Sequence, residues 1–320
     1  MPDSTDLIEA FDARALRRDN RRDFFKAFTT ASAIAGGFGL VAKADPALAQ
    51  SAPSDGDILN FALNLEYLEA QFYVQAATGQ GLAENLLGGT GARGQATGGR
   101  KVNFTDQAVA QYAREIAADE LAHVAFLRGA LGSAAVAQPT IDIGIAPEGA
   151  FSTAARAAGL VGPGQSFDAY ANDENFLLAA YIFEDVGVTA YKGASPLISN
   201  KIFLEAAAGL LAVEAYHASI IRTVLFAKGM QTPALIDATE AISNARDSLD
   251  GPTDLDQGVR VRNTIVGQGS NIAPLDQDGL AYSRSAGQVL NIVYLNRAAV
   301  TGGGFFPNGV NGPLRMSAAN

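Results

Sequence analysis

The two histidines of this chain occur in the same local pattern. Each follows a glutamate by three residues: Glu120 precedes His123, and Glu214 precedes His217. Glutamate itself is scarce, with 12 residues among 320, so a coincidence at both histidines is improbable. Residues three apart lie on one face of a helix, so each pair can present a carboxylate and an imidazole together. Oxygen and nitrogen donors without sulfur are typical ligands of iron or manganese.

Two further helical segments supply matching carboxylates. Aligning residues 66–73 with residues 184–191 places Glu66 opposite Glu184. Each glutamate is followed seven residues later by a tyrosine, Tyr73 or Tyr191, which is two helical turns along the same face. These tyrosines are also compatible with ordinary core packing. The alignment predicts that Glu66 and Glu184 complete a site of four carboxylates and two imidazoles.

The same alignment separates the candidate ligands from other charged residues. Glu69 falls opposite Gly187, which favours Glu66 as the partner of Glu184 and leaves Glu69 as an alternative ligand. Arg128 and Arg222 each follow a histidine by five residues, so the two helical pairs look duplicated, and both arginines are expected in salt bridges within the helix pairs. Five acidic residues are expected to be solvated or ion-paired: Glu69, Glu115, Asp119, Asp185 and Glu205.

Hydrophobic periodicity predicts an all-α chain. Four long helices are expected over residues 56–78, 105–131, 173–192 and 199–228. A crossover over residues 133–171, with a short helix near 153–160, separates the two pairs, which is the order of a four-helix bundle with one long crossover. A fifth helix over 232–249, an irregular segment over 250–280 and a short helix over 285–297 follow. The predicted units are a bundle over 50–230 and a C-terminal helix with a wrapping extension over 231–320.

Residues 1–49 have the pattern of an export signal. Arg21 and Arg22 precede Phe24 and Lys26, and an apolar stretch rich in Gly, Ala and Thr leads to small residues before Gln50. This resembles a twin-arginine (Tat) signal peptide that is cleaved after residue 49. Its apolar run is short for a membrane span, and no other segment is expected to reach transmembrane length. We therefore expect a periplasmic or secreted protein without a stable membrane span after cleavage.

Composition excludes several kinds of site. The chain has no cysteine, which rules out disulfides, zinc fingers, thiolate-bound iron–sulfur clusters and cysteine nucleophiles. The net charge is −10, and an acidic protein is a poor partner for nucleic acid or an anionic membrane. Four inward-facing carboxylates would repel one another in a bundle core, and two divalent cations would neutralise them.

With these residues on four helices, the sequence resembles the ferritin-like superfamily of di-iron and di-manganese carboxylate proteins. The mature chain, including residues 290–293 and 303–309, is similar to bacterial ferritin-like proteins related to plant desiccation-related proteins. The resemblance implies that Glu120 and Glu214 bridge two metal ions, and that Tyr73 and Tyr191 hydrogen-bond to ligand carboxylates across the site. The implied metal ligands are Glu66, Glu120, His123, Glu184, Glu214 and His217.

The resemblance also implies an activity. The leading hypothesis is a site of two iron ions, or alternatively two manganese ions, that oxidises Fe(II) or reacts with O2 or peroxide in stress protection. Two alternatives stay open: a dimanganese catalase-like enzyme, and a desiccation-protective protein in which metal only stabilises the bundle. A homo-oligomer is compatible with the sequence, but the long C-terminal addition argues against a mineral-storing cage.

Overall fold

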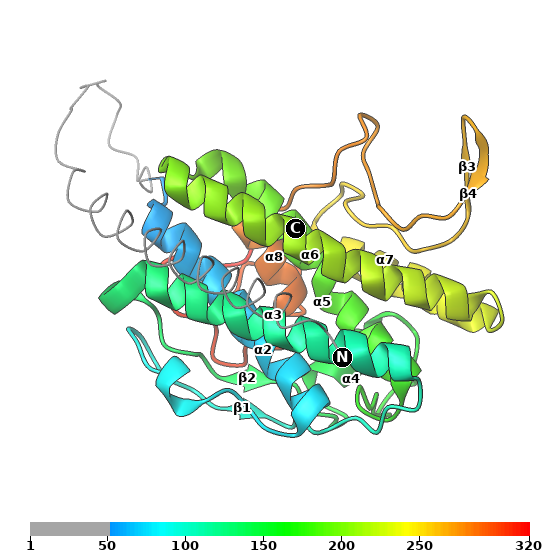
Figure 1. Cartoon of the computed structure of the whole chain (residues 1–320), viewed down its shortest axis with the longest axis horizontal. Coiled ribbons are helices and arrows are strands. Elements are labelled where there is room, and N and C mark those ends of the chain that lie inside the picture. The colour runs from blue at the N-terminus through cyan, green and yellow to red at the C-terminus, as the bar shows by residue number, and fades with distance from the viewer. Residues whose placement is uncertain (1–51) are drawn as a thin grey trace, which may run out of the picture. The chain divides into compact units, whose positions relative to one another are not determined.

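The computed structural model describes residues 52–320, and four long helices dominate them (Figure 1). They are α2 (Asp55–Thr78), α3 (Gln107–Leu131), α5 (Asp173–Ala194) and α6 (Lys201–Gly229). Helix α2 packs along α3, α5 packs along α6, and the two pairs meet through α2–α5 and α3–α6 contacts. The predicted all-α four-helix bundle is confirmed. The predicted signal peptide lies outside the described residues.

Shorter elements fill the crossover and the C-terminal region. Between α3 and α5 lie a 3₁₀ turn (Gly132–Ala134), strand β2 (Ile141–Asp142) and helix α4 (Ala150–Ala157). Strand β2 pairs in parallel with β1 (Ala96–Thr97), which follows the 3₁₀ turn Glu84–Leu86. A third 3₁₀ turn (Ser195–Leu197) joins α5 to α6. The fifth helix is α7 (Pro233–Asp250), followed by a hairpin of β3 (Arg262–Thr264) and β4 (Gly267–Gly269) and by α8 (Ala286–Val293). Helix α8 ends earlier than predicted because Leu295 adopts a left-handed φ of 53°.

The contacts at the helix ends define the directions of the bundle helices. Asp106, which precedes α3, forms an ion pair with Lys228 at the end of α6 (3.3 Å). Asp55, at the start of α2, accepts hydrogen bonds from the backbone N–H groups of Ser199 and Asn200, between α5 and α6. Helices α3 and α6 are therefore antiparallel, and so are α2 and α5. This arrangement brings the middles of all four helices to one level.

Local sequence explains where these helices begin. At each start, a side-chain oxygen accepts a hydrogen bond from a backbone N–H in the first helical turn, a group that has no partner within the helix. Helix α2 has the complete reciprocal arrangement, in which Ser54 accepts from the backbone of Asp57 and the Asp57 side chain accepts from the backbone of Ser54. The N-cap residues of the four bundle helices are Ser54, Asp106, Asn172 and Asn200.

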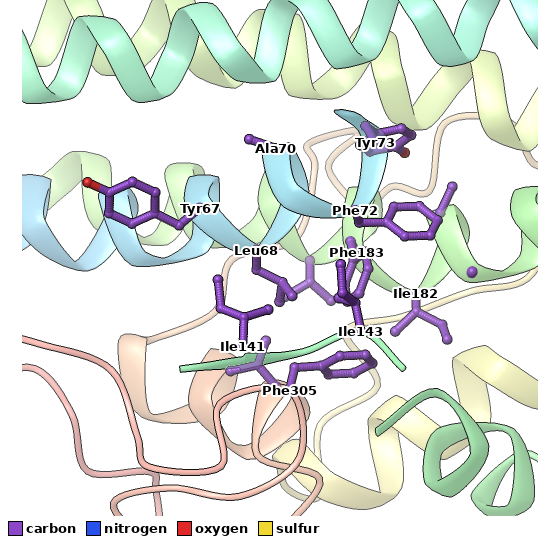
Figure 2. Close-up of a cluster of buried hydrophobic side chains, with 14 of the residues drawn as sticks. Tyr67, Leu68, Ala70, Phe72, Tyr73, Ile141, Ile143, Ile182, Phe183 and Phe305 are labelled. Atoms are coloured by element: carbon purple, nitrogen blue, oxygen red, sulfur yellow. The ribbon is translucent and has the colours of Figure 1, made fainter. Parts of the chain in front are cut away.

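An aromatic cluster joins the C-terminal region to the bundle core (Figure 2). The ring of Phe72 in α2 lies 5.6 Å from that of Phe183 in α5 and 5.5 Å from that of Phe151 in α4. Phe305, which follows α8, lies 4.9 Å from Phe183 and 5.2 Å from Phe151, and it is fully buried. Burying an aromatic side chain of this size removes a large apolar surface from water. The C-terminal extension is therefore part of the core.

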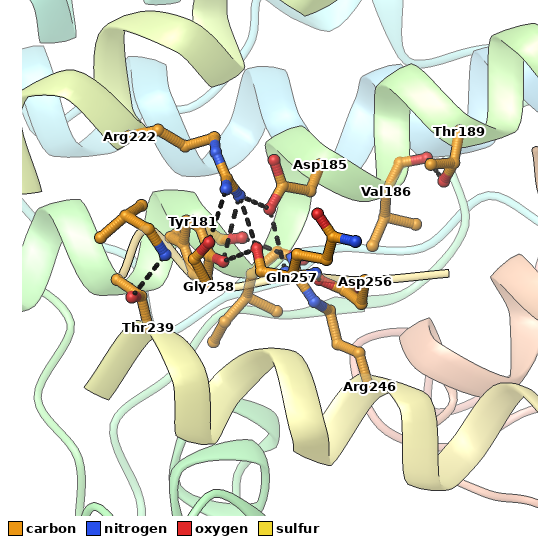
Figure 3. Close-up of polar contacts among 12 residues, drawn as sticks. Tyr181, Asp185, Val186, Thr189, Arg222, Thr239, Arg246, Asp256, Gln257 and Gly258 are labelled. Carbon is orange, nitrogen blue, oxygen red and sulfur yellow. Dashed lines mark hydrogen bonds and ion pairs between the residues drawn. The ribbon is translucent and has the colours of Figure 1, made fainter. Parts of the chain in front are cut away.

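A buried ionic network makes a second connection between the bundle and the C-terminal region (Figure 3). Asp185 of α5 binds Arg222 of α6 (2.7 Å) and Arg246 of α7 (3.0 Å). Arg246 also pairs with Asp256, and Arg284 continues the chain of contacts to Asp256 (2.9 Å). Positive and negative charges balance in this set. Its members are Arg222, Arg246, Arg284, Asp185, Asp250 and Asp256.

The two arginines at matching positions of the helix pairs behave differently. Arg222 forms the predicted salt bridge with Asp185 inside its helix pair. The matching prediction for Arg128 is wrong, because Arg128 donates to the hydroxyl of Tyr67 (2.5 Å) and to the carbonyl of Gly88 (2.6 Å). The acidic residue that could have paired with it is absent, since Tyr67 stands in α2 where α5 has Asp185.

Helix α6 corrects the expectation that no segment after residue 49 reaches transmembrane length. Among the described residues it is the one helix that is long and apolar enough to cross a membrane by length and composition, with a mean hydropathy of 1.4 over its most apolar window. In the fold it packs against α5, and its polar side chains Glu214, His217 and Arg222 are buried.

The ionic network predicts a large effect of one neutral substitution. Asp256→Asn leaves Arg246 and Arg284 buried with too little negative charge, so we expect the free energy of unfolding to fall by about 3–5 kcal/mol. The matched control is Asp237→Asn, whose ion pair with Arg260 lies on the surface. The control should leave the free energy of unfolding unchanged within error. Chemical denaturation measures both, and equal values for the two variants would contradict the assigned role.

Candidate metal centre

The six predicted ligands lie together in the bundle interior. Each of the four helices contributes at least one of them, and each of these residues is at most 7% exposed. One donor atom from each of Glu66, Glu120, His123 and Glu214 lies within 4.8 Å of the other three. Glu184 and His217 complete the group from α5 and α6. The antiparallel arrangement places the paired positions of the two helix pairs around one point.

His123 directs one ring nitrogen at three carboxylates. Its Nδ1 lies 3.1 Å from Oε2 of Glu66, 3.5 Å from Oε2 of Glu120 and 3.7 Å from Oε1 of Glu214. Three different helices supply these oxygens. A nitrogen lone pair surrounded by carboxylate oxygens at this spacing is suited to a shared cation.

His217 repeats this arrangement in the other helix pair. Its Nδ1 lies 3.0 Å from Oε1 of Glu120 and 3.8 Å from Oε2 of Glu184. Its other nitrogen, Nε2, lies 3.2 Å from Oδ2 of Asp119. A carboxylate that accepts the second N–H of an imidazole fixes the ring and leaves the first nitrogen free to bind metal. Asp119 is ion-paired as expected, but its contact with His217 was missed; its position next to Glu120 was the available signal.

Six donor atoms of this cluster lack a hydrogen-bond partner among the described residues. Both carboxylate oxygens of Glu120 and of Glu214, Oε2 of Glu184 and Nδ1 of His217 are buried and unsatisfied. Buried polar atoms are nearly always hydrogen-bonded, so six orphans at one point need an explanation. Nδ1 of His217 and Oε1 of Glu120 are close but make no hydrogen bond in suitable geometry. Once Nδ1 of His217 has lost its proton, these two atoms are placed as two ligands of one cation would be, so the residues present fit a metal centre.

The two tyrosines connect the helix pairs crosswise. The hydroxyl of Tyr73 in α2 donates to Oε1 of Glu184 in α5, and the hydroxyl of Tyr191 in α5 donates to Oε1 of Glu66 in α2. Both tyrosines are buried. Each hydroxyl occupies one carboxylate oxygen and leaves the other, Oε2, toward a histidine. The hydrogen bonds across the site that the resemblance implied are present.

Burial and mutual repulsion shift the proton affinities of the carboxylates. Burial, only partly offset by His123, raises the pKa of Glu66 to about 7. Burial likewise raises the pKa of Glu184 to about 8, against the opposing charge of His217. The pKa of Glu214 is well above its ordinary value because of burial and the neighbouring carboxylates. For Glu120, burial alone would raise the pKa, but the close approach and positive charge of both histidines outweigh it and lower the pKa.

The histidines respond in the opposite sense. Burial alone would lower the pKa of each imidazole, but the carboxylates outweigh it. The pKa of His123 is raised to about 11 by Glu66 and Glu120, and that of His217 to about 9 by Glu120 and Glu184. In the metal-free protein, some carboxylates and both imidazoles therefore hold protons, and these protons supply the positive charge that metal ions would otherwise bring. Metal ions must displace these protons to bind.

Glu69 differs from the expectation for it. It is only 5% exposed, and within residues 52–320 it has neither a hydrogen bond nor an ion pair, so the expectation of a solvated or ion-paired residue is wrong. Glu115 and Glu205 are exposed as expected. Glycine at position 187 makes room for the buried carboxylates, because a Cβ atom there would lie 2.2 Å from Oε2 of Glu214 and 3.5 Å from Oε1 of Glu69. The alignment of Glu69 with Gly187 was the signal for this space.

Comparison with known proteins supports the same interpretation. The Ferritin-like domain family matches residues 54–227. The chain is 28% identical over 273 residues to Ferritin-like catalase Nec2 of Nesocodon mauritianus, covering 82% of this chain and 85% of that protein. It is 32% identical over 245 residues to Desiccation-related protein PCC13-62 of Craterostigma plantagineum, covering 72% of this chain and 75% of that protein. No solved structure matches the chain significantly.

The resemblance to dinuclear carboxylate proteins predicts two transition-metal ions per chain. Protein purified from its native compartment should contain about two equivalents of iron or manganese by elemental analysis. Glu120→Ala and His217→Ala each remove a donor from the cluster and should lower the metal content substantially. Glu115→Ala, an exposed change on the same helix as Glu120, should leave it unchanged. Less than one equivalent in the unaltered protein would exclude a dinuclear centre.

The raised pKa values predict how pH affects the metal-free protein. Above the ordinary carboxylate pKa of 4.5, folded Glu66 and Glu184 keep protons that the unfolded chain has lost. Unfolding then releases protons, so the contribution to stability is complete below pH 4.5 and is lost as pH rises through about 7 and 8. The melting temperature in excess chelator should fall between pH 5 and pH 9, while metal affinity rises because fewer protons must be displaced.

Variants provide the control for this pH dependence. Replacing both Glu66 and Glu184 by glutamine removes the two titrating groups, so the fall in melting temperature over pH 5–9 should become shallower. A melting temperature of the chelated, unaltered protein that rises with pH over this interval would contradict the assigned protonation states.

Proposed function

The chain belongs to the ferritin-like family, and from that premise we propose that it binds two iron ions between its four bundle helices and uses them to oxidise Fe(II) or to react with O2 or peroxide in stress protection. The observation that carries this proposal is the set of buried, unsatisfied donor atoms contributed by α3, α5 and α6. The proposed ligands are Glu66, Glu120, His123, Glu184, Glu214 and His217. Carboxylate and imidazole donors suit iron and manganese alike.

Charge supports two ions of charge +2. The four proposed ligand carboxylates carry −4 when deprotonated, and desolvating them without compensation is expensive. Two divalent ions would cancel that charge and replace the protons held by Glu66 and Glu184. Iron ions, when bound, supply the electrons for reduction of O2 or peroxide.

The surrounding residues would hold the ligands in place. Tyr73 and Tyr191 each donate to one oxygen of a carboxylate and so orient the other oxygen toward the centre. Asp119 orients His217 through Nε2. The aromatic side chain of Phe72, next to Tyr73, is completely buried and helps keep bulk water out of this region. Such support holds metal ligands in a fixed geometry.

A dimanganese catalase-like enzyme is the second candidate. The relative from Nesocodon mauritianus is named a ferritin-like catalase and aligns over 82% of this chain. The same donor set can hold manganese. Catalase activity converts two molecules of peroxide to one O2 and two waters, so O2 release per peroxide consumed separates this candidate from a peroxidase or Fe(II) oxidase.

A non-catalytic protective protein is the third candidate. It is suggested by the name of the desiccation-related relative, which is 32% identical. In this case the metal would stabilise the bundle by neutralising buried carboxylates, without turnover. A fall in melting temperature on chelation is expected for all three candidates, so only turnover distinguishes them.

Activity measurements test these candidates directly. Iron-loaded protein should consume peroxide or oxidise Fe(II) faster than buffer, and Glu120→Ala should abolish the effect. Tyr73→Phe removes only the hydroxyl that orients Glu184, so we expect about a 10–100-fold lower rate with a smaller change in metal content. Glu115→Ala is the control with unaltered activity. If neither iron- nor manganese-loaded protein turns over while chelation lowers the melting temperature, the third candidate stands.

We further propose export by the Tat route, which places the protein in the periplasm or outside the cell. The basis is the sequence of residues 1–49, with the arginine pair at positions 21 and 22. Mature protein should begin at Gln50, as determined by N-terminal sequencing. Replacing Arg21 and Arg22 by lysine should keep the precursor inside the cell, and normal export of that variant would refute the assignment.

A further inference from the structure

The symmetry between the two helix pairs fails at one position beside the metal centre. One turn beyond the paired ligands Glu66 and Glu184, α2 carries Glu69 and α5 carries Gly187. The side chains of Glu69 and Glu214 both approach the space that a Cβ atom of residue 187 would fill. The carboxylates of Glu69 from α2 and Glu214 from α6 therefore both lie beside Gly187 of α5.

A small cavity lies at this position. Its volume is about 20 Å³. Helices α2, α5 and α8 and the segment after α8 form its walls, and Figure 2 shows three of the lining residues, Leu68, Ile182 and Phe305, in one cluster. Apart from Glu69 and Gly187, every lining residue is apolar. No residue of α3 or α6 contributes to it, so the cavity approaches the centre from the side of the C-terminal extension.

The size and polarity of the cavity define what it can hold. A molecule the size of water needs about 10–15 Å³ of such space, so the cavity admits one small molecule. Water also needs two to four polar partners, and this lining offers a single carboxyl group, that of Glu69. Hydrogen peroxide, with two O–H donors and four lone pairs, is disfavoured for the same reason. A small apolar molecule loses no hydrogen bonds by entering.

We propose that this cavity is a binding site for dioxygen next to the metal centre. Glu69 and Gly187 line its end nearest the proposed ligands, since a Cβ atom at position 187 would lie 2.2 Å from Oε2 of Glu214, and Val293 and Phe305 of the C-terminal region line it as well. The inference rests on the proposed function for its purpose, because dioxygen is a substrate of an iron oxidase and a product of a catalase. The binding of dioxygen to the cavity does not depend on whether the protein catalyses a reaction.

The site also assigns a role to the C-terminal extension. Val293 ends α8, and Phe305 packs on Phe183 and Phe151. Together with Ile292, these side chains supply the part of the apolar lining that comes from the C-terminal region. The extension therefore shapes the environment of the centre on the α2 and α5 side, although it contributes none of the proposed metal ligands.

Gas binding can be tested without any reaction. Crystals of the full mature protein, as purified, are pressurised with xenon, which occupies apolar cavities. We expect one xenon atom in contact with Val293 and Phe305. Val293→Ile adds a methylene group to the wall of a cavity of about 20 Å³ and should abolish the xenon density. The matched control is Val289→Ile, one turn earlier in α8 and outside the lining, which should keep it.

Dioxygen itself provides the second measurement. In zinc-loaded protein, which is diamagnetic and has no redox chemistry, dissolved O2 should increase the NMR relaxation of the Leu68 and Val293 methyl groups more than that of the Val289 methyl groups. Val293→Ile should remove this enhancement at Leu68. Absence of xenon and of selective relaxation in the unaltered protein would overturn the inference, as would equal xenon binding in Val293→Ile. If xenon and dioxygen both bind as expected but the metal-loaded protein shows no turnover, the proposed catalytic function is refuted and the assignment of the cavity stands.

Discussion

The structure depends on the burial of acidic side chains at one point in a helical bundle. Glu66, Glu69, Glu120, Glu184 and Glu214 are all at most 5% exposed. Carboxylates in such surroundings must be protonated, paired with cations or bound to metal. The two imidazoles can neutralise only part of the charge, and several donor atoms remain unsatisfied. The antiparallel helices, the crosswise tyrosines and the glycine at position 187 are all arranged around this cluster.

A second buried electrostatic network stabilises the structure outside the centre. Asp185 directly follows the candidate ligand Glu184 and binds Arg222 and Arg246. Unlike the glutamate cluster, this network contains equal numbers of basic and acidic residues and needs no ion from solution. It attaches α7 and the segment around Asp256 to the helix that carries Glu184. The two clusters are adjacent in sequence but are neutralised in different ways.

The two helix pairs are similar in their ligands and different around them. Tyr73 and Tyr191 make equivalent hydrogen bonds, so the inner ligand geometry is nearly symmetric. Arg128 and Arg222 occupy matching positions, but only Arg222 has an aspartate beside it. The helix pairs differ most at the matching positions occupied by Glu69 and Gly187, and both of these residues line the cavity. Asymmetry of this kind gives the two sides of a symmetric centre different access to small molecules.

The sequence alone was sufficient for the helices and for the six candidate ligands. Helical periodicity and cap residues are local properties, and the Glu–His spacing of three places both side chains on one face whatever the surroundings. The fifth helix, the single long crossover and the matching positions of Tyr73 and Tyr191 also followed from spacing within the chain. The role of Arg128 did not, because its partners, Tyr67 and Gly88, lie 61 and 40 residues away.

Only the tertiary structure decided the environment of those ligands. Glu69 has the sequence position of a helical surface residue, and it is buried because Gly187 on another helix leaves space for it. The contact of Asp119 with His217 and the packing of Phe305 on Phe183 also join segments far apart in the chain. Burial, charge neutralisation and the cavity depend on which helices meet, and this depends on the packing of the whole bundle. The sequence determined which residues could bind metal, and the fold determined what surrounds them.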